Sequence, residues 1–421
     1  MNISHATILC YDRGDHTFLA EKIAETAKEV LFHTPILGPH PVVRDDQIGF
    51  GLDGVEKIDD FEEYKDKVDY IFFPSVYDGE KALKLREEGH RVFGSWDEIE
   101  LNRILFLDTL VKVGLKPVPT HLAIGIDEAM EYLTGKENKW LKTPYYRGDF
   151  NTIHYANMKT FTPWFNDMKC SLGERGSSTM EILIQDDFPA EVETGGDRYN
   201  IDGQFTKKGL VGYEIKDKGY MCKVFDEMPK IINDVDMKIG PELGEHKYRA
   251  AWSTELRVNK KGEVRFTDAT ARFGAPPGGL MCEIFDHDDQ SFGQTVCDIA
   301  DGIVPELKEV AKFGATIVMA SWFNEKKEIC VQFPKEFKQN VKLQNCYKYK
   351  DEYYCVENET DGYFGEVVAW GNSVKEATEK AKEIADSLVC LGKEYDSSVF
   401  DKASECIEKG ERFGINFKGG K

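Results

Sequence analysis

Residues 248–277 constrain the fold of this chain more than any other stretch. Polar and apolar residues alternate from Glu255 to Asn259, and the alternation resumes at Val264 after the turn Lys260-Lys261-Gly262. Alternation with a period of two indicates half-buried β-strands, and a short glycine-containing turn between two such runs indicates a hairpin. The stretch therefore predicts two antiparallel strands that share one polar face.

The polar face of this predicted hairpin carries oxygen ligands. Glu255 lies near the end of the first strand, Asp268 and Thr270 lie at the end of the second, and Arg272 follows in a turn rich in glycine and proline. Mg²⁺ bound against a nucleotide takes one or two carboxylates together with phosphate oxygens and water. The face is suited to hold Mg²⁺ against phosphates. The alternative is a surface hairpin with a solvated, charged face.

The composition limits the class of protein. The chain has 421 residues, of which 41% are hydrophobic and 31% charged, a balance typical of globular proteins with several domains. It has no apolar run long enough to span a membrane and no signal peptide at its start, so we expect a cytoplasmic protein without a membrane partner. A net charge of −21 disfavours an extended nucleic-acid surface, because such a surface neutralises phosphates with Lys and Arg. A local basic cleft for one small phosphorylated ligand is compatible with this charge.

The first hundred residues alternate between strands and helices. Strands are expected at 6–10, 69–74 and 91–94, and helices at 17–30 and 80–88, which together favour an open, mainly parallel α/β sheet. The turn at residues 11–16 precedes a helix start, where free amides can bind an anion. An ordinary connection between strand and helix is the alternative.

The middle of the chain supplies further candidates. Helices are expected at 96–113 and 126–133, then a strand at 139–143 that carries Lys142 and leads into a polar, aromatic loop with Arg147. Lys142 is either a solvated lysine or a phosphate ligand. The apolar strand at 181–188 ends in acids, which either bind a ribose through its hydroxyls or are simply loop acids: Asp186, Asp187, Glu191 and Glu193.

The remaining elements follow from the same patterns. Antiparallel strands are expected at 199–224, a connection at 240–246, a helix within 298–313, a strand at 315–320 and a β-rich stretch at 327–356. The end of the chain predicts a strand at 365–370 and helices at 374–391 and 398–410.

Four motifs in this order give the chain a family resemblance. The first is the glycine-containing turn at 11–16, and the second is Val92-Phe93-Gly94 followed by a helix with Asn102-Arg103. The third is the stretch 182–188, which resembles an adenine hinge, and the fourth is Arg272-Phe273-Gly274 with Pro276, which resembles a family signature. The chain thus resembles the ATP-grasp superfamily and, within it, the phosphoribosylamine-glycine ligases, over nearly its whole length.

The resemblance implies a fold and a division into domains. The fold would be of the α/β (α+β) class, an ATP-grasp fold with an N-terminal open parallel α/β domain and a C-terminal α+β domain. The boundaries would be 1–105 for the N-terminal domain, 106–190 for the small ATP-grasp lobe, 191–325 for the core lobe with the hairpin, and 326–421 for the C-terminal domain.

The resemblance also implies an activity, which is ATP-dependent ligation of a small carboxylate such as glycine to an amine such as a phosphorylated ribose or nucleotide, with ATP and Mg²⁺ as cofactors. Arg272 would be catalytic, because it would stabilise charge on the transferring phosphoryl group. The implied sites are ATP at Arg103, Lys142, Arg147, Asp186, Phe188 and Glu193, metal at Glu255, Asp268 and Thr270, and substrate at Arg13, Gly14, Gly274 and Pro276.

The chain departs from the family pattern at several of these positions. Asp268 and Thr270 stand where the family has Glu and Asn, and Ala275 stands where the signature has an acid. These changes fall where the family holds its metal and its own substrates. The identities of the carboxylate substrate and the amine substrate therefore stay open. A non-catalytic nucleotide-binding protein on the same fold is the alternative function.

Overall fold

The computed structural model describes residues 2–35, 45–145, 152–358 and 361–417. The chain divides into two compact units. The first comprises Met1–Asp97, Glu193–Glu255 and Thr270–Lys421, and the second comprises Glu98–Val192 and Leu256–Ala269. No described helix has the length and apolar character needed to cross a membrane. The division into four domains stays a prediction.

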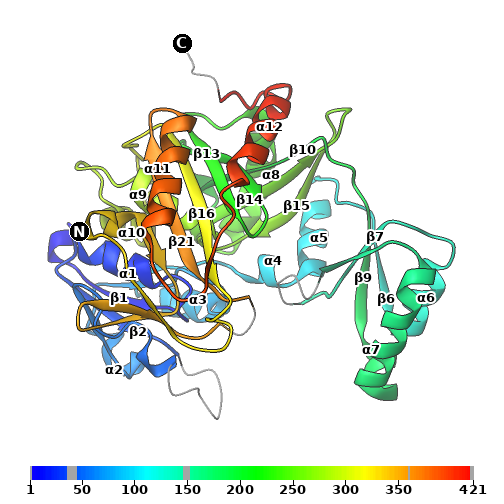
Figure 1. Ribbon diagram of the computed structural model, residues 1–421, viewed down its shortest axis with the longest axis horizontal. Helices are drawn as coiled ribbons and strands as arrows, with labels where there is room; N and C mark the ends of the chain where they lie inside the picture. Colours follow the sequence, from blue (N-terminus) through cyan, green and yellow to red (C-terminus); the bar gives the residue numbers. More distant parts are fainter. Residues whose placement is uncertain (1, 36–44, 146–151, 359–360, 418–421) are drawn as a thin grey trace. The chain divides into compact units, whose positions relative to one another are not determined.

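The first unit begins with a parallel sheet, as the sequence predicts (Figure 1). Its strand order is β3-β2-β1-β4-β5, and every described pair of neighbours is parallel. Apolar residues of the strands and helices form one core on this sheet, which includes Leu9, Leu31, Phe61, Ile71 and Leu85. The elements are β1 (Thr7–Tyr11), α1 (Thr17–Ala24), β2 (Glu29–His33), β3 (Val55–Lys57), α2 (Phe61–Tyr64), β4 (Tyr70–Phe72), α3 (Gly79–Glu87) and β5 (Val92–Phe93).

The large sheet of the molecule is antiparallel in its described pairs. Its strand order is β15-β14-β10-β12-β13-β16-β21-β18, with β11 beside β10 and β22 beside β16. The predicted hairpin is confirmed as β14 (Arg249–Val258) and β15 (Val264–Thr270). The other strands are β10 (Val192–Ile201), β11 (Gln204–Phe205), β12 (Gly209–Ile215), β13 (Gly219–Phe225), β16 (Phe313–Ser321), β18 (Val341–Leu343), β21 (Tyr363–Gly371) and β22 (Lys393–Glu394).

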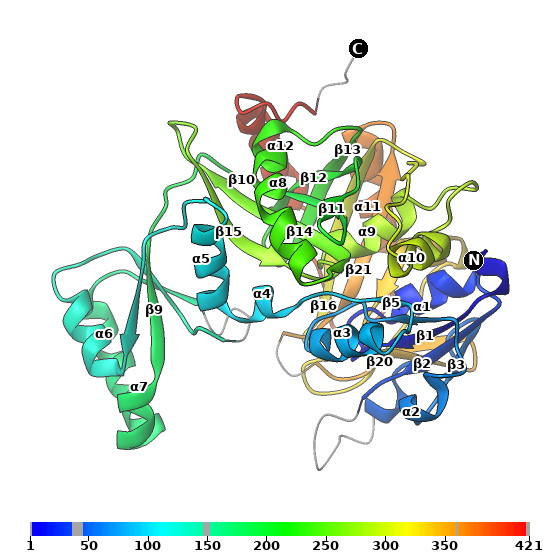
Figure 2. The ribbon, with the colours of Figure 1, turned by 180° about the vertical axis from the view of Figure 1, so that it is seen from behind.

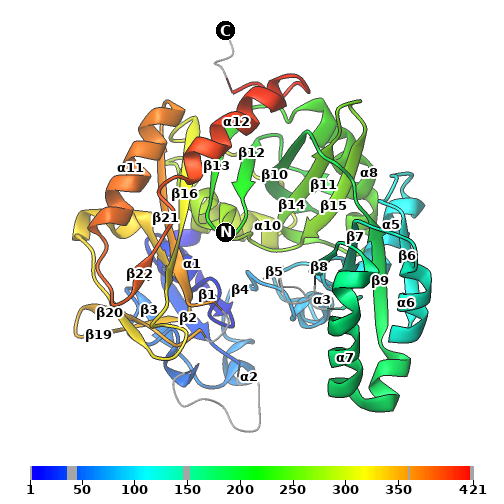
Figure 3. The ribbon, with the colours of Figure 1, turned by 45° about the vertical axis from the view of Figure 1, so that its right-hand side comes forward.

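Helices cover both faces of this sheet. Figures 1 and 3 show α11 (Val374–Ser387) and α12 (Val399–Glu411) lying across one face, where α11 packs on β16 and β21 and α12 packs on β12 and β13. Figure 2, the view from behind, shows α8 (Lys230–Glu245) on the opposite face. A small antiparallel sheet of β17 (Ile329–Val331), β20 (Glu352–Cys355) and β19 (Cys346–Tyr349) confirms the β-rich stretch.

The second unit contains an antiparallel sheet of order β6-β9-β7-β8 with α6 and α7 packed on it. Its core gathers apolar residues from both layers, including Ile126, Leu133, Leu141, Phe165 and Ile182. The elements are α4 (Glu98–Leu101), α5 (Arg103–Lys112), β6 (Thr120–Ile124), α6 (Ile126–Leu133), β7 (Lys139–Lys142), β8 (Thr152–Tyr155), α7 (Met158–Thr179) and β9 (Glu181–Asp186).

Four sequence expectations about elements are wrong. The helix expected at 17–30 ends at Ala24, because Val30 and its neighbours form the buried strand β2. The helix expected at 96–113 breaks at Asn102, whose side chain caps α5. Residues 240–245 belong to α8, and His246 is its C-cap, so this segment is not a connection. The helix expected within 298–313 is α10 (Phe292–Ala300), which is preceded by the unpredicted α9 (Pro277–Ile284).

Candidate functional site

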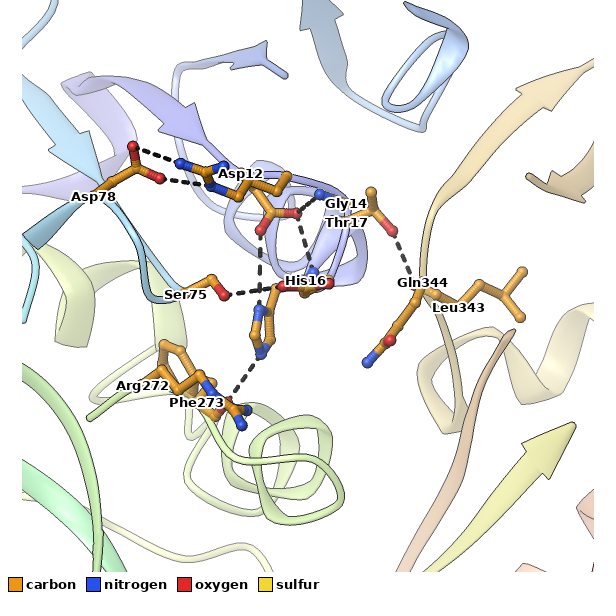
Figure 4. Close-up of polar contacts among 12 residues, drawn as sticks. Asp12, Gly14, His16, Thr17, Ser75, Asp78, Arg272, Phe273, Leu343 and Gln344 are labelled. Carbon is orange, nitrogen blue, oxygen red and sulfur yellow. Dashed lines mark hydrogen bonds and ion pairs between the residues drawn. The ribbon is translucent and has the colours of Figure 1, made fainter. Parts of the chain in front are cut away.

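The turn after β1 is held by hydrogen bonds from its backbone to the carboxylate of Asp12, its first residue. Asp12 is 2% exposed, and its Oδ2 accepts hydrogen bonds from the backbone N–H groups of Gly14 and His16, each at 3.0 Å (Figure 4). Arg13 lies beside it and donates from Nε and Nη2 to the carboxylate of Asp78, at 3.0 and 3.2 Å. The Ser75 hydroxyl donates to Asp15 at 3.0 Å. The two predicted substrate residues, Arg13 and Gly14, thus belong to a turn with three nearby carboxylates.

The Arg272-Phe273-Gly274 signature is fixed against this turn. Phe273 is fully buried, and its ring stacks on Phe93 with centroids 5.7 Å apart and an interplanar angle of 7°. The carbonyl of Phe273 accepts hydrogen bonds from His16 Nε2 at 3.0 Å and from Arg272 Nη1 at 3.2 Å. Figure 4 shows both donors converging on this residue. The packing of Phe273 therefore sets the position of the predicted catalytic arginine in the first unit.

Gly274, the last residue of the signature, and Pro276, two residues later, are the other predicted substrate residues in this segment. A Cβ at Gly274 would lie 2.8 Å from Pro277 Cγ, so a side chain does not fit there without movement. The carbonyl of Pro276 accepts a hydrogen bond of 3.5 Å from the hydroxyl of Thr316 on β16. Gly274 and Pro276 connect the signature to α9 and to the large sheet, and their substrate role stays a prediction.

Burial changes the titration of two groups in the turn. Burial, together with the charge of Asp15, raises the pKa of Asp12 to about 7 against the opposing hydrogen bonds of the turn. Burial lowers the pKa of His16 to about 4, and the positive charge of Arg272 acts in the same direction. His16 is therefore neutral at pH 7. Because its Nε2 donates to a carbonyl, its Nδ1 carries a lone pair.

A second group of predicted residues lies on neighbouring strands of the large sheet. Glu193 is on β10 and Glu255 on β14, which is the strand next to β10. Gly195 on β10 pairs with Gly212 on β12, and Glu193 and Glu214 each lie two residues beyond this pair. Desolvation by the surrounding protein is the main cause that raises the pKa of Glu214 to about 8, and the negative charges of Glu255, Asp217, Asp197 and Glu193 act in the same direction.

Glu214 is a candidate residue that the sequence analysis missed. It follows the apolar run of β12 and is the strand's one charged residue, and an acid near the end of an otherwise apolar strand was the signal that could have identified it. Thr270 lies at the end of β15, two residues after Asp268, so both side chains project from the same face of that strand. No group of three or more His, Cys, Asp or Glu side chains within the described residues is placed to hold a metal ion by itself.

The second unit brings three predicted residues into one crevice. Arg103, Lys142 and Asp268 line it, together with Gln185 and Thr267 and with apolar residues such as Phe106, Leu183 and Phe266. Arg103 begins α5 directly after the capping residue Asn102, and its Nη1 donates to the carbonyl of Thr143 at 2.6 Å. The crevice encloses about 20 Å³, which is room for about one water molecule.

The predicted adenine hinge has internal partners. Asp186 accepts a hydrogen bond of 2.6 Å from Lys139 on the neighbouring strand β7. The guanidinium of Arg265 lies 5.1 Å from the ring centroid of Phe188. Arg147 lies outside the described residues. The ATP-binding roles of these residues stay predictions.

The parallel N-terminal sheet, the small antiparallel lobe and the large antiparallel sheet with its C-terminal helices define an ATP-grasp fold. The structure of phosphoribosylamine-glycine ligase from Thermotoga maritima matches with a TM-score of 0.66 at 15% identity, over 93% of this chain and 99% of the other. The biotin carboxylase domain of 2-oxoglutarate carboxylase from Hydrogenobacter thermophilus, crystallised with MgADP, matches with a TM-score of 0.65 at 11% identity, over 95% and 98%.

An L-amino acid ligase from Bacillus licheniformis matches with a TM-score of 0.59 at 15% identity, over 93% of this chain and 99% of the other. No protein-family model matches the sequence, and neither does any curated protein sequence. The likeness therefore establishes the fold that the sequence predicted.

Proposed function

We propose that the protein is an ATP-dependent ligase that joins a small carboxylate to an amine and releases ADP and phosphate. The observation that carries the proposal is the crevice of the second unit, where Arg103, Lys142 and Asp268 come together on an ATP-grasp fold. Two cations beside a carboxylate suit a nucleotide phosphate chain with its metal ion. Solved structures with this fold include a phosphoribosylamine-glycine ligase and an L-amino acid ligase.

The proposed reaction has two steps. An oxygen of the substrate carboxylate attacks the γ-phosphorus of ATP, ADP leaves, and an acyl phosphate forms. The amine then attacks the acyl carbon, inorganic phosphate leaves with the former carboxylate oxygen, and the nitrogen gives up a proton. Such reactions are accelerated by positioning and by stabilising developing charge. Arg103 and Lys142 hold phosphates, and Arg272 neutralises charge on the transferring phosphoryl group.

Mg²⁺ belongs to this proposal, with Glu255, Asp268 and Thr270 as protein ligands and Glu214 as an added acid. The donor set fits, because the hard oxygens of carboxylates are the ligands that Mg²⁺ takes, and Glu214 and Glu255 lie on strands of the same sheet. When bound, Mg²⁺ would neutralise phosphate charge. The cytoplasm as location and a reaction akin to purine biosynthesis belong to the same proposal.

The test is ATP-dependent phosphate release across a panel of carboxylates and amines. We expect one pair to sustain turnover, and we expect Lys142→Ala and Asp268→Ala each to lower kcat/KM by about 100-fold or more, because each removes a charge that stabilises the transferring group. Lys260→Ala is the matched control, because it removes an exposed lysine from the turn of the hairpin that carries Asp268. ATP binding without turnover for every pair would favour the non-catalytic alternative.

A further inference from the structure

The first unit contains a cavity of about 490 Å³ to which the proposed function assigns no role. It is lined by the loop before β3, the end of β17, the 3₁₀ helix Lys335–Asn340 and the hairpin of β19 and β20. Figure 3 shows this hairpin beside the strands of the parallel sheet. Pockets for small organic ligands typically measure about 300–1,000 Å³. The cavity therefore has room for such a ligand, and it shares no residue with the crevice of the second unit.

One wall of the cavity is mainly apolar and is fixed by strand pairing. Val331, Tyr353 and Lys348 stand side by side, because Tyr353 on β20 pairs with Val331 on β17 and with Lys348 on β19. The ring of Phe333 stacks on that of Tyr353, with centroids 5.7 Å apart and an interplanar angle of 24°. The hydroxyl of Tyr353 donates to Glu21 of α1 at 2.8 Å. The two rings thus form a preformed surface on which an apolar group can pack.

Lysines from two segments add positive charge to the lining. Lys348 donates to the carboxylate of Asp53 at 2.6 Å, and Lys338 donates to the same carboxylate and lies 3.6 Å from Glu21. An ammonium group has three N–H donors, so these contacts leave at least one on each lysine for another acceptor. Lys335 is exposed and makes no ion pair within the described part of the chain. A ligand carboxylate would meet several donors here.

Asp351 supplies the opposite charge. It lies in the turn between β19 and β20 with φ of +66°, lines the cavity, and makes no ion pair with any residue that the structure describes. Glu352 also lines the cavity, but its side chain projects from the opposite face of the sheet to that of Tyr353, since successive strand residues alternate. Lys350, the other residue of the turn, is outside the lining. The cavity therefore presents both a cation and an acid that lack an ion pair among the described residues.

We propose that this cavity binds a zwitterion of dipeptide size that carries an apolar side chain. The ligand carboxylate lies among the ammonium groups of Lys335 and Lys348, the ligand ammonium group meets Asp351, and the apolar side chain packs on Phe333 and Tyr353. A ligand with a single charge would leave one of the lining charges uncompensated, which selects against it. The proposal goes beyond the ligase activity, since none of these residues takes part in it.

Three probes that differ by one charge test this proposal. Glycyl-phenylalanine is the zwitterion, N-acetyl-glycyl-phenylalanine lacks the ammonium group, and glycyl-phenylalaninamide lacks the carboxylate. Calorimetric titration without ATP gives the Kd of each. We expect the zwitterion to bind at least about tenfold more tightly than either analogue. We expect Lys335→Ala to remove most of its advantage over the amide, and Asp351→Asn to remove most of its advantage over the acetylated peptide.

Lys327→Ala is the control, because it removes an exposed lysine of the same unit that lies outside the lining. Because the cavity and the crevice share no residue, we expect the Kd of the zwitterion to be the same in Lys142→Ala and in the presence of saturating ADP and Mg²⁺. These titrations need no turnover, so a failure of the proposed ligase does not affect them. Equal affinity for the three probes, tighter binding of a singly charged analogue, no binding, competition with ADP, or unchanged affinities in Lys335→Ala would each overturn the proposal.

Discussion

Gly14 is the residue at which the first turn tolerates least change. It has φ of +114°, and a Cβ there would lie 2.1 Å from Asn345 Oδ1. Asn345 is itself held, because its N–H donates to the Gly14 carbonyl at 2.7 Å. Gly89 has a similar φ of +101°, but a Cβ there would have no described neighbour within 4 Å, so the two glycines differ mainly in crowding.

We therefore expect Gly14→Ala to lower the free energy of unfolding by about 2 kcal/mol more than Gly89→Ala does, since both strain the left-handed backbone and only Gly14→Ala adds a collision. Urea unfolding of the two variants measures the difference. Equal losses would mean that Asn345 moves aside at little cost.

Asp12 and His16 give opposite pH dependences of stability. The folded pKa of Asp12, about 7, lies above its ordinary value of 3.8, so between these limits the folded state holds a proton that the unfolded state has lost, and stability falls as pH rises. The folded pKa of His16, about 4, lies below its ordinary value of 6.5, so stability rises with pH between 4 and 6.5.

The two slopes offset each other in the native protein from pH 4 to 6.5. Asp12→Asn removes one of them and is expected to leave stability rising with pH over this window, by up to about 1.4 kcal/mol per pH unit relative to the native protein. Urea unfolding at a series of pH values measures the slope. A variant whose pH profile is parallel to that of the native protein would contradict the assignment.

At the scale of elements, periodicity predicted most strands and helices, and the errors have local causes. The sequence predicts a connection at residues 240–246, but Gly240 and Gly244 lie in α8, where a Cβ would come within 2.7 Å of Gly203 O and 2.9 Å of Asp202 O, respectively. These glycines allow the helix to pack against the turn after β10. The two glycines can be recognised in the sequence, but the turn that they approach, at Asp202 and Gly203, cannot be.

Asn102 is a similar case, because a capping residue interrupts what reads as one amphipathic helix. Its side chain accepts from the N–H groups of Ile104 and Leu105 at 3.1 Å each. We expect Asn102→Ala to cost about 1 kcal/mol of stability and Asn102→Asp to retain most of it, since aspartate caps equally well. Thermal and urea unfolding measure both variants, and equal losses for Ala and Asp would argue against a capping role.

At the scale of the whole molecule, the order of elements predicted the fold, whereas the partners of the site residues were out of reach. Arg13 and Asp78 are 65 residues apart in the sequence, and His16 and Phe273 are 257 apart, so no local pattern joins them. The sequence predicted phosphate and metal roles for Arg103, Lys142 and Asp268, which stay predictions, and the structure places the three residues in one crevice. It missed Glu214, because the acids whose charges act on it, Glu255 and Glu193, lie on other strands of the sheet.

The transfer of oxygen from substrate to phosphate is the most direct test of the proposed ligase. The carboxylate substrate found in the panel is labelled with ¹⁸O on both oxygens, and the inorganic phosphate released during turnover is analysed by mass spectrometry. An acyl phosphate requires one labelled oxygen in each phosphate formed, and this is the result we predict. Release of unlabelled phosphate would show that ATP is hydrolysed without activating the carboxylate and would contradict the central claim.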